Sequence, residues 1–414
     1  MSLPQSAMAT LSASRPELRV ALFTGNYNYI KDGVALTLNR LVGFLERRGV
    51  PVLVIAPTGP MPAFEATGEL ISVPSVPIPF RSEYRISLGL SRKARRRLEA
   101  FRPTLFHIAV PDILGYQALN LAGTWKVPVV ASFHTRYDTY LKFYGLNLLE
   151  SLGRKYFRYF YNKCVQVYPP SDSMADVIRA EGFSQNVRVW SRGVDAEHFN
   201  PAKRSLDWRR SLGVADGEVI VVFVGRLVKE KNTGILVRIF DTLARQATPF
   251  RAMIVGDGPE EARMKMALPN AIFTGFLHGD ALAHAYASAD VFLFPSESET
   301  FGNVTLEAMA SGLPAVCANA SGSRSLVLDG VTGYLVDPAS EAAYVVKLGE
   351  LVRDSKLRAK LGQNARARAQ SFSWDHILDG LLENYYEVIR NNHASSALGQ
   401  SPAGSEAQAS FRAE

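Results

Sequence analysis

Strand-sized apolar runs alternate with helix-like segments along almost all of the 414 residues, and this alternation restricts the fold more than any other feature. It predicts βαβ units with parallel sheets, in which ligands bind at the carboxyl ends of the strands. Because the pattern occurs in two consecutive sets and the chain exceeds a typical single core, we expect two doubly wound domains. The expected strands are residues 18–24, 51–56, 70–74, 105–110, 127–133, 164–168 and 187–190 in the first half, and 219–225, 250–256, 271–275, 291–295, 314–318 and 333–336 in the second.

The ends of the chain and one internal stretch set the expected domain limits. Residues 1–16 and 392–414 are rich in small and polar side chains, which predicts disordered tails. Between them we expect a first Rossmann-like domain at 17–198, a second at 199–371 and an amphipathic terminal helix at 372–391. The N-terminal segment lacks the basic start and unbroken apolar block of a signal peptide, and no apolar run has the length of a membrane span.

Composition fits a globular enzyme with an anionic partner. The apolar fraction is 47% and the charged fraction is 21%, and both are ordinary for a globular chain. The only cysteines, Cys164 and Cys317, lie far apart in apolar contexts, so we expect neither a disulfide nor a zinc site, and a reducing cytoplasm fits this usage. The net charge of +7 favours a lipid surface, a nucleic acid or a phosphorylated substrate, and charge alone does not choose among them.

Two glutamates eight positions apart mark the most informative segment, PSESETFGNVTLEAMASGLP at 295–314. Glu299 lies on the loop after an expected buried strand, and Glu307 lies about one turn into the following helix. The free N–H groups of a helix N-terminus form an anion site, where a carboxylate would repel phosphate and instead accept hydrogen bonds from sugar or ribose hydroxyls. The alternative is a solvated acidic loop followed by a glutamate that interacts with the helix dipole.

Two cations follow the first strand of the second half, in VGRLVKEKN at 224–232. Arg226 at the strand end and Lys231 five residues later suit a diphosphate, whose charge increases when it leaves. The next strand ends in GDGPE, where Gly258 either lets the backbone approach a ligand or makes a tight turn. An ordinary basic loop is the alternative interpretation. No carboxylate-rich metal site is evident, so we expect the two cations to take the place of Mg²⁺.

The segment SETFGNVTLEAMASGLP resembles the Glu-x7-Glu signature of retaining glycosyltransferases of family 4, and the resemblance covers nearly everything between the tails. It implies the α/β fold named GT-B, in which two doubly wound parallel-sheet Rossmann-like domains face each other across a cleft and the last helix crosses back to the first domain. It also implies a nucleotide-sugar donor. Arg226 and Lys231 would then contact its phosphates, Glu299 its sugar and Glu307 its ribose.

The resemblance assigns further residues to the donor. His134, in SFHTRYDTY, follows a strand and would contact the donor sugar, although a lone histidine there is also a common structural hydrogen bonder. Gly33 would contact the phosphate or the sugar, but relatives carry a second glycine where this chain has Asp32, which would alternatively cap the helix. Arg192 stands in SRGVD where asparagine is usual. The other expected donor-binding residues are Gly258, His278 in a nucleobase loop, and Phe301, Gly302 and Asn303 of the turn before Glu307.

No nucleophile is obvious, so we expect a metal-independent front-face reaction, with the nucleotide sugar as co-substrate and no other cofactor. The expected catalytic residues are His134, Arg226, Lys231 and Glu299. The alternative is Glu299 as a covalent nucleophile. An NAD-dependent oxidoreductase is disfavoured, because the first strand runs into GNYN at 25–28 and not into a glycine-rich phosphate turn.

A basic segment in the first half predicts where the acceptor binds. The segment 82–102 has the pattern of a basic amphipathic helix with Leu88, Leu90, Leu98 and Phe101 on its apolar side, which suits an anionic membrane. The alternative is a solvated helix face whose apolar residues pack in the core. Nucleic acid is not expected, because no recognised binding motif accompanies the charge. The expected membrane or acceptor residues are Arg92, Lys93, Arg95, Arg96, Arg97, Arg136 and Tyr137.

Together these observations favour a retaining glycosyltransferase that moves a sugar from UDP or GDP to a hydroxyl of a membrane lipid of diacylglycerol, phosphatidylinositol or ceramide type. In this it resembles bacterial glycolipid enzymes of family 4. We expect a cytoplasmic protein, peripheral on the inner face of the cell membrane. Two alternatives stay open: the same chemistry on a soluble or polysaccharide acceptor, and a sugar-nucleotide binding protein without turnover.

Overall fold

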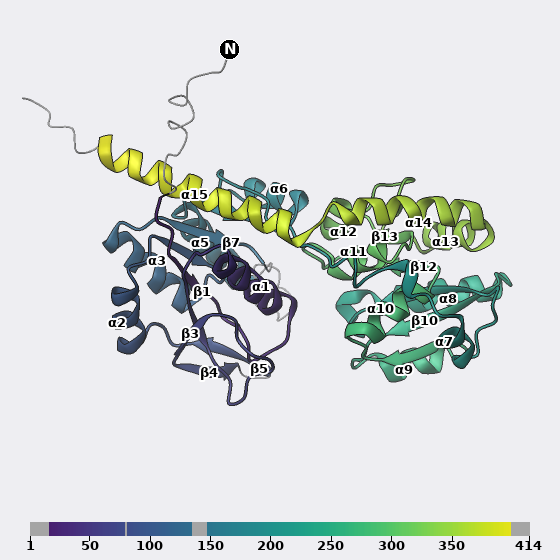
Figure 1. Cartoon of the computed structure of the whole chain (residues 1–414). Coiled ribbons are helices and arrows are strands. Elements are labelled where there is room, and N and C mark those ends of the chain that lie inside the picture. The colour runs from purple at the N-terminus through teal and green to yellow at the C-terminus, as the bar shows by residue number, and fades with distance from the viewer. Residues whose placement is uncertain (1–15, 79–80, 135–146, 399–414) are drawn as a thin grey trace, which may run out of the picture. The chain divides into compact units, whose positions relative to one another are not determined.

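The structure divides the chain into two compact units. The computed structural model describes residues 16–78, 81–134 and 147–398. Unit 1 joins the chain up to Ser132 with Tyr156–Val167 and the residues from Asp379 on, and unit 2 consists of Phe133–Lys155 and Tyr168–Leu378. Each unit contains one six-stranded sheet with helices packed on it (Figure 1).

Unit 1 holds a parallel sheet in doubly wound order. Its strands are β1 (Val20–Phe23), β2 (Val52–Pro57), β3 (Glu69–Val73), β6 (Leu105–Ile108), β7 (Val129–Ser132) and β8 (Gln166–Tyr168), and the helices wholly or partly in it are α1 (Gly33–Arg47), α2 (Arg92–Phe101), α3 (Ile113–Trp125), α5 (Asn147–Asn162) and α15 (Trp374–Leu398). The strand order is β3-β2-β1-β6-β7-β8, and β1 pairs in parallel with both β2 and β6. The order therefore reverses between β1 and β6, the place where doubly wound sheets bind ligands.

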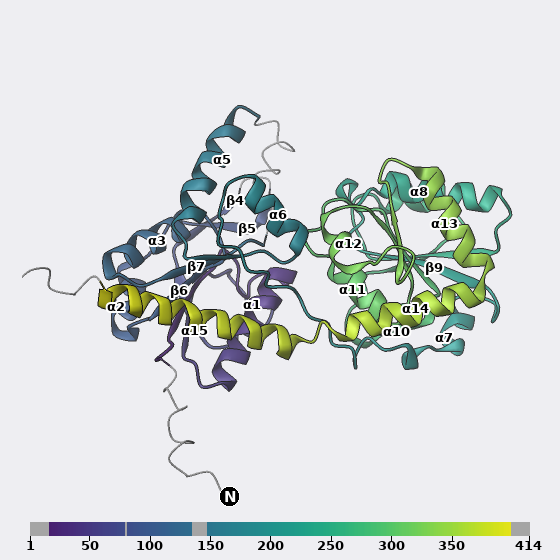
Figure 2. The same ribbon diagram turned by 90° about the horizontal axis from the view of Figure 1, so that it is seen from above.

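Unit 2 repeats this plan. Its strands are β9 (Val219–Val224), β10 (Phe250–Val255), β11 (Ile272–Gly275), β12 (Val291–Phe294), β13 (Ala315–Ala318) and β14 (Gly333–Val336); its helices are α6 (Asp172–Ala180), α7 (Leu206–Ser211), α8 (Thr233–Arg245), α9 (Glu261–Ala267), α10 (Gly279–Ser288), α11 (Asn303–Ala310), α12 (Ser321–Leu326), α13 (Glu341–Arg353) and α14 (Ser355–Gln370), with short turns η2 (Pro201–Lys203) and η3 (Lys229–Lys231). The strand order is β11-β10-β9-β12-β13-β14 and the pairings are parallel. Figure 2 shows β9 between α8 and α13 on one side and α10 and α14 on the other, as in a doubly wound domain. The apolar run of β9 is buried throughout, which fits a central parallel strand.

Two sequence predictions about local structure are wrong. Residues 187–190 form no strand: Val187 takes part in a single β-bridge and residues 188–190 are irregular, although the backbone N–H of Trp190 donates to the carbonyl of Pro169 at 2.9 Å and its side chain is buried. The expected helix 82–102 begins only at Arg92, where the Ser91 side chain accepts a hydrogen bond from the backbone of Ala94. The segment before it is instead a strand of an antiparallel hairpin, β4 (Ser75–Ile78) with β5 (Arg81–Ser87).

A buried polar cluster fixes α15 to the first sheet. The hydroxyl of Tyr385 lies 2.5 Å from His107 Nδ1, and His107 Nε2 lies 2.8 Å from the hydroxyl of Ser132. His107 belongs to β6 and Ser132 ends β7, so the cluster joins the helix to two neighbouring strands. Because unpaired buried polar groups are costly, this arrangement selects one position for the helix on unit 1.

Candidate functional site

The predicted donor residues of unit 2 lie on loops that follow neighbouring strands. Arg226 follows β9, and Lys231 ends the short turn η3 after it. Glu299 lies on the loop after β12, and β12 pairs in parallel with β9. The order of the second sheet reverses between these two strands, so the three residues stand at the switch point where doubly wound domains bind ligands.

Lys231 and Glu299 form an ion pair at this switch point. Both side chains are 22% exposed, and Lys231 Nζ also lies 3.4 Å from the hydroxyl of Ser298. Asn232 joins the same two loops, since its amide donates to the carbonyl of Pro295 at 2.9 Å. The structure thus brings together two of the four predicted catalytic residues and holds their loops by side-chain hydrogen bonds.

Arg226 offers a positive charge on the loop that also carries Lys231. Its side chain is exposed, and among the described residues none forms an ion pair with it. The loop after β10 packs on its neighbour: a Cβ atom at Gly258 would lie 2.4 Å from the carbonyl oxygen of Leu227, so only glycine fits there. Gly258 therefore shapes the loop that carries Arg226, and a contact of Gly258 with the donor stays a prediction.

The loop that carries Glu299 is held from α12. The hydroxyl of Ser321 donates to the backbone carbonyl of Glu299 at 3.0 Å. A Cβ atom at Gly322 would lie 2.7 Å from the Cβ of Glu299, so the close approach requires glycine. Sequence reasoning missed Gly322, whose only signal is its place at the start of a helix after a buried strand.

The turn between the two glutamates has a core-packed side and an open side. The Phe301 side chain is buried and contacts Phe372 with ring centroids 6.2 Å apart, so only its backbone is placed to meet a ligand. Gly302 has φ of 100°, a conformation that favours glycine, and caps α11. Asn303, the first residue of α11, is exposed.

Glu307 lies in the second turn of α11 with a hydroxyl partner. The Tyr286 hydroxyl lies 3.2 Å from a carboxylate oxygen of Glu307 and 3.2 Å from the carbonyl of Val304. Burial raises the pKa of Glu307 to about 7, and the hydrogen bond from Tyr286 lowers it only in part. The carboxyl group therefore changes charge near neutral pH.

Two further predicted donor residues lie on exposed loops or helix starts. His278 follows β11 and stacks on Phe276 with ring centroids 5.8 Å apart, and Phe276 is 69% exposed. An exposed aromatic pair of this kind offers a face on which a nucleobase can stack. In unit 1, Gly33 is the first residue of α1, and the Asp32 side chain accepts a hydrogen bond from Ala35 at 2.8 Å, which confirms Asp32 as the helix cap.

His134 follows β7 and is buried against Arg192. Arg192 Nη2 lies 2.6 Å from His134 Nδ1, and the guanidinium lies over the ring of Trp190 at 4.9 Å. The hydroxyl of Thr300, next to Glu299, donates to the backbone carbonyl of His134 at 3.3 Å. His134 is thereby linked to the loop that carries Glu299.

The basic helix α2 presents cations, but its apolar side is packed on the protein. Leu98 and Phe101 are buried, so the apolar face that the sequence suggested for a membrane is occupied by the core. Arg97 forms an ion pair with Glu69 at 2.5 Å, whereas Arg92 and Lys93 are exposed. Arg95 and Arg96 are also exposed, and the predicted acceptor residues Arg136 and Tyr137 lie outside the described residues.

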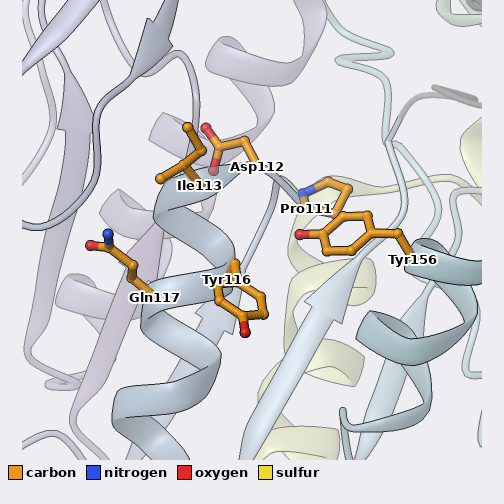
Figure 3. Close-up of a pocket in the computed structure, with 6 residues that line it drawn as sticks. All are labelled: Pro111, Asp112, Ile113, Tyr116, Gln117 and Tyr156. Atoms are coloured by element: carbon orange, nitrogen blue, oxygen red, sulfur yellow. The ribbon is translucent and has the colours of Figure 1, made fainter. Parts of the chain in front are cut away.

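An open pocket of about 510 Å³ lies in unit 1 at the carboxyl end of β6. In Figure 3 the ring of Tyr156, from α5, lies beside Pro111, while Ile113 and Tyr116 project from the first turns of α3. Asp112 caps α3 by accepting from Gly115 at 2.9 Å, and burial raises its pKa to about 6. The remaining lining residue, Gln117, accepts a hydrogen bond from the backbone of Leu90 at 2.7 Å, which places the start of α2 near the pocket.

Two features of the described residues bear on membranes and metals. Within the part of the chain that the structure describes, no helix combines the length and apolar character needed to cross a membrane. The same residues include no group of three or more histidines, cysteines or acids placed to hold a metal ion.

Comparison with known proteins gives a consistent result. One family model, described as Glycosyltransferase Family 4, matches residues 31–198, and another, described as Glycosyl transferases group 1, matches residues 205–368. The chain is 33% identical over 373 residues to sulfoquinovosyl transferase SQD2 of Arabidopsis thaliana, which covers 88% of this chain and 72% of the relative. It is 34% identical over 387 residues to the GDP-mannose-dependent alpha-mannosyltransferase of Mycobacterium tuberculosis, which covers 92% of this chain and 99% of the relative.

A more distant relative and a solved structure extend the comparison. Alpha-monoglucosyldiacylglycerol synthase of Streptococcus pneumoniae is 25% identical over 390 residues, covering 89% of this chain and 88% of the relative. Sucrose-phosphate synthase from Thermosynechococcus elongatus matches with a TM-score of 0.74 at 19% identity, covering 90% of this chain and all of that one. Together with the two sheet orders, this structural match confirms the expected two-domain α/β fold of GT-B type.

Proposed function

The chain belongs to the glycosyltransferases described by the family 4 and group 1 models, and from this premise we propose a retaining, metal-independent transfer of a sugar from a nucleoside diphosphate to a lipid hydroxyl. The observation that carries the proposal is the ion pair of Lys231 with Glu299 at the switch point of the second sheet, with Arg226 exposed on the loop that also carries Lys231. Two cations and one acid at a strand end match a diphosphate joined to a hydroxylated ring.

Each part of the donor has a matching group in unit 2. Arg226 and Lys231 would bind the diphosphate, and Lys231 would exchange its partner Glu299 for a phosphate oxygen. Glu299, released in this way, accepts hydrogen bonds from sugar hydroxyls. Glu307 on α11 would accept from the ribose, and the exposed ring of Phe276 would stack on the base.

The reaction follows from these positions. The bond between the anomeric carbon and the diphosphate oxygen breaks, and the cations stabilise the charge that the leaving group gains. The acceptor oxygen attacks the same face of the sugar and forms the new bond, so configuration is retained. The acceptor proton passes to the departing phosphate oxygen. Glu299 is paired with Lys231 and serves better as a hydroxyl acceptor than as a nucleophile.

Unit 1 supports a lipid as acceptor. Four of the pocket's lining residues are apolar or aromatic, namely Pro111, Ile113, Tyr116 and Tyr156. Cations at the start of α2 lie near it through the contact between Leu90 and Gln117. An apolar pocket beside exposed cations suits an amphiphile at an anionic surface, so we place the enzyme on the inner face of the cell membrane. The names of two relatives, sulfoquinovosyl transferase and alpha-monoglucosyldiacylglycerol synthase, fit this acceptor class.

A screen of sugar nucleotides tests the proposal. Purified protein is heated with GDP-mannose, UDP-glucose, UDP-galactose and UDP-sulfoquinovose, and specific binding is expected to raise the melting temperature with one of them. The matched control is the same protein with Glu299 and Glu307 both changed to alanine. The preferred donor is then incubated with vesicles that contain diacylglycerol, phosphatidylinositol or ceramide, and a glycolipid product is expected. If the protein binds a sugar nucleotide and glycosylates a soluble acceptor but none of the lipids, the acceptor is a soluble molecule or a polysaccharide and not a lipid.

A further inference from the structure

Arg192 is a buried cation whose guanidinium contacts a histidine. Its Nη2 lies 2.6 Å from His134 Nδ1, and its Nη1 lies 3.1 Å from the carbonyl oxygen of Trp190. Both Arg192 and His134 are 6% exposed. Among the described residues no acid forms an ion pair with Arg192, and burial lowers its pKa to about 10, so it still carries its charge at neutral pH.

This contact determines which nitrogen of His134 carries the proton. A guanidinium has only N–H donors and no acceptor. The hydrogen bond at 2.6 Å therefore requires a lone pair on His134 Nδ1, which leaves the single proton of the neutral ring on Nε2. A second proton, on Nδ1, would remove this hydrogen bond and place two positive charges in contact in a buried site.

We propose that Arg192 is a positioning residue that holds His134 in the neutral tautomer with the proton on Nε2. His134 then acts only as a hydrogen-bond donor toward an oxygen of the donor sugar, and not as a base. The tautomer follows from the contact alone, whereas the role toward the sugar rests on the proposed function.

The surroundings of His134 favour a positioning role over simple packing. A buried charge is costly, and an apolar side chain of similar length would fill the space at lower cost. The groups in contact with His134 include the guanidinium of Arg192, the ring of Trp190 at 5.7 Å between centroids, and the Thr300 hydroxyl on its backbone carbonyl. Thr300 belongs to the loop that carries the Lys231–Glu299 pair, so Arg192 and that loop orient His134 from two directions.

Nitrogen NMR of the histidine rings tests the tautomer. The chain has seven histidines, and His134→Gln identifies the signal of His134 in protein labelled with ¹⁵N-histidine. In wild type we expect Nε2 protonated and Nδ1 unprotonated from pH 8 down to about 5.5, well past the ordinary value of about 6.5. In Arg192→Met, which removes the adjacent positive charge, we expect the ring to take up its second proton at a higher pH than in wild type. A wild-type ring protonated on Nδ1, or one that titrates near 6.5, overturns the proposal even if the methionine variant fails to fold.

Ligand binding tests the role toward the sugar. Calorimetry compares the full nucleotide sugar with the nucleoside diphosphate that lacks the sugar. Loss of one hydrogen bond in Arg192→Met is expected to weaken binding of the sugar nucleotide by roughly 3- to 10-fold and to leave the nucleoside diphosphate unchanged. Arg192→Lys, which keeps a donor, should recover part of the loss. Equal losses for both ligands overturn the sugar-facing role. Failure of wild type to bind any sugar nucleotide would refute the proposed function, while the NMR result would still decide the tautomer.

Discussion

The hydroxyl of Tyr286 lies 3.2 Å from the carboxylate of Glu307, in a site where Tyr286 is fully buried. Burial raises the pKa of Glu307 to about 7. A ribose hydroxyl is a donor, so it prefers the carboxylate form of Glu307 over the protonated form. Donor binding should therefore favour loss of the Glu307 proton and should weaken as the pH falls through 7.

The expected size of this effect follows from the pKa. The carboxylate fraction is about one-tenth at pH 6 and nearly complete at pH 8, so the dissociation constant should be roughly tenfold higher at pH 6. Calorimetry with an intact nucleotide sugar is the right measurement, because its diphosphate is doubly esterified and does not titrate in this range. Glu307→Gln should bind more weakly at pH 8 and show no pH dependence. Equal wild-type affinity at pH 6 and pH 8 would remove the ribose role.

The Lys231–Glu299 pair leads to a prediction about turnover. Lys231→Ala should lower kcat by on the order of 10²-fold, because the charge that develops on the diphosphate loses a fixed cation. Lys229→Ala is the matched control, since Lys229 is an exposed lysine on the same short turn. Release of nucleoside diphosphate under saturating donor gives the rate. Near-normal turnover of Lys231→Ala, or an equal loss in the control, would argue against a diphosphate at this place.

Much of the fold could be predicted from the sequence, because buried parallel strands appear as short apolar runs. The apolar runs at 219–224 and 291–294 are neighbouring strands of one sheet, so Arg226 and Glu299 lie at the same carboxyl-terminal edge of that sheet. The hairpin β4–β5 was not predicted, because the apolar residues around 86–101 were assigned to a single helix. In the structure Leu88 lies outside α2 and is exposed, while Leu98 is buried.

Contacts that arise only from tertiary packing could not be predicted from the sequence. Arg192 and His134 are separated by 58 positions, and no local pattern indicates that they meet. The sequence marked Arg192 as unusual in its motif, but it gave no partner. Tyr286 and Glu307 lie 21 positions apart on two helices, and a buried tyrosine in an apolar helix carries no sign of a carboxylate partner.

The exposed cations of α2 predict binding to anionic membranes through charge alone, since the apolar side of the helix is buried. Replacing Arg92, Lys93 and Arg96 by alanine should weaken binding to vesicles with anionic lipid by on the order of 10²-fold, at about 1 kcal/mol for each cation. Flotation with vesicles measures the bound fraction.

A second triple variant controls for the change in net charge. Arg353, Lys356 and Lys360 are exposed cations at the end of α13 and on α14 in unit 2, and their replacement by alanine removes the same charge. This variant should bind vesicles nearly as wild type does. Equal losses in the two triple variants would show that overall charge, and not α2, attracts the protein to the surface.

The pocket at the end of β6 predicts a specific defect in acceptor use. Ile113 lines the pocket and is 47% exposed. An apolar part of the acceptor can therefore bury the surface of this side chain that now contacts water. Ile113→Ser should raise KM for a lipid acceptor by roughly tenfold, within the range for burial of one aliphatic side chain. Affinity for the nucleotide sugar should not change, because Ile113 lies in unit 1, whereas Arg226, Lys231, Glu299 and Glu307 belong to unit 2. The matched control is Val346→Ser, a β-branched residue on α13 that is 55% exposed and lies outside the pocket. If Ile113→Ser and its control gave the same KM for the lipid, or if a short water-soluble acceptor suffered the same loss, the pocket would not be the site of the apolar part of the acceptor.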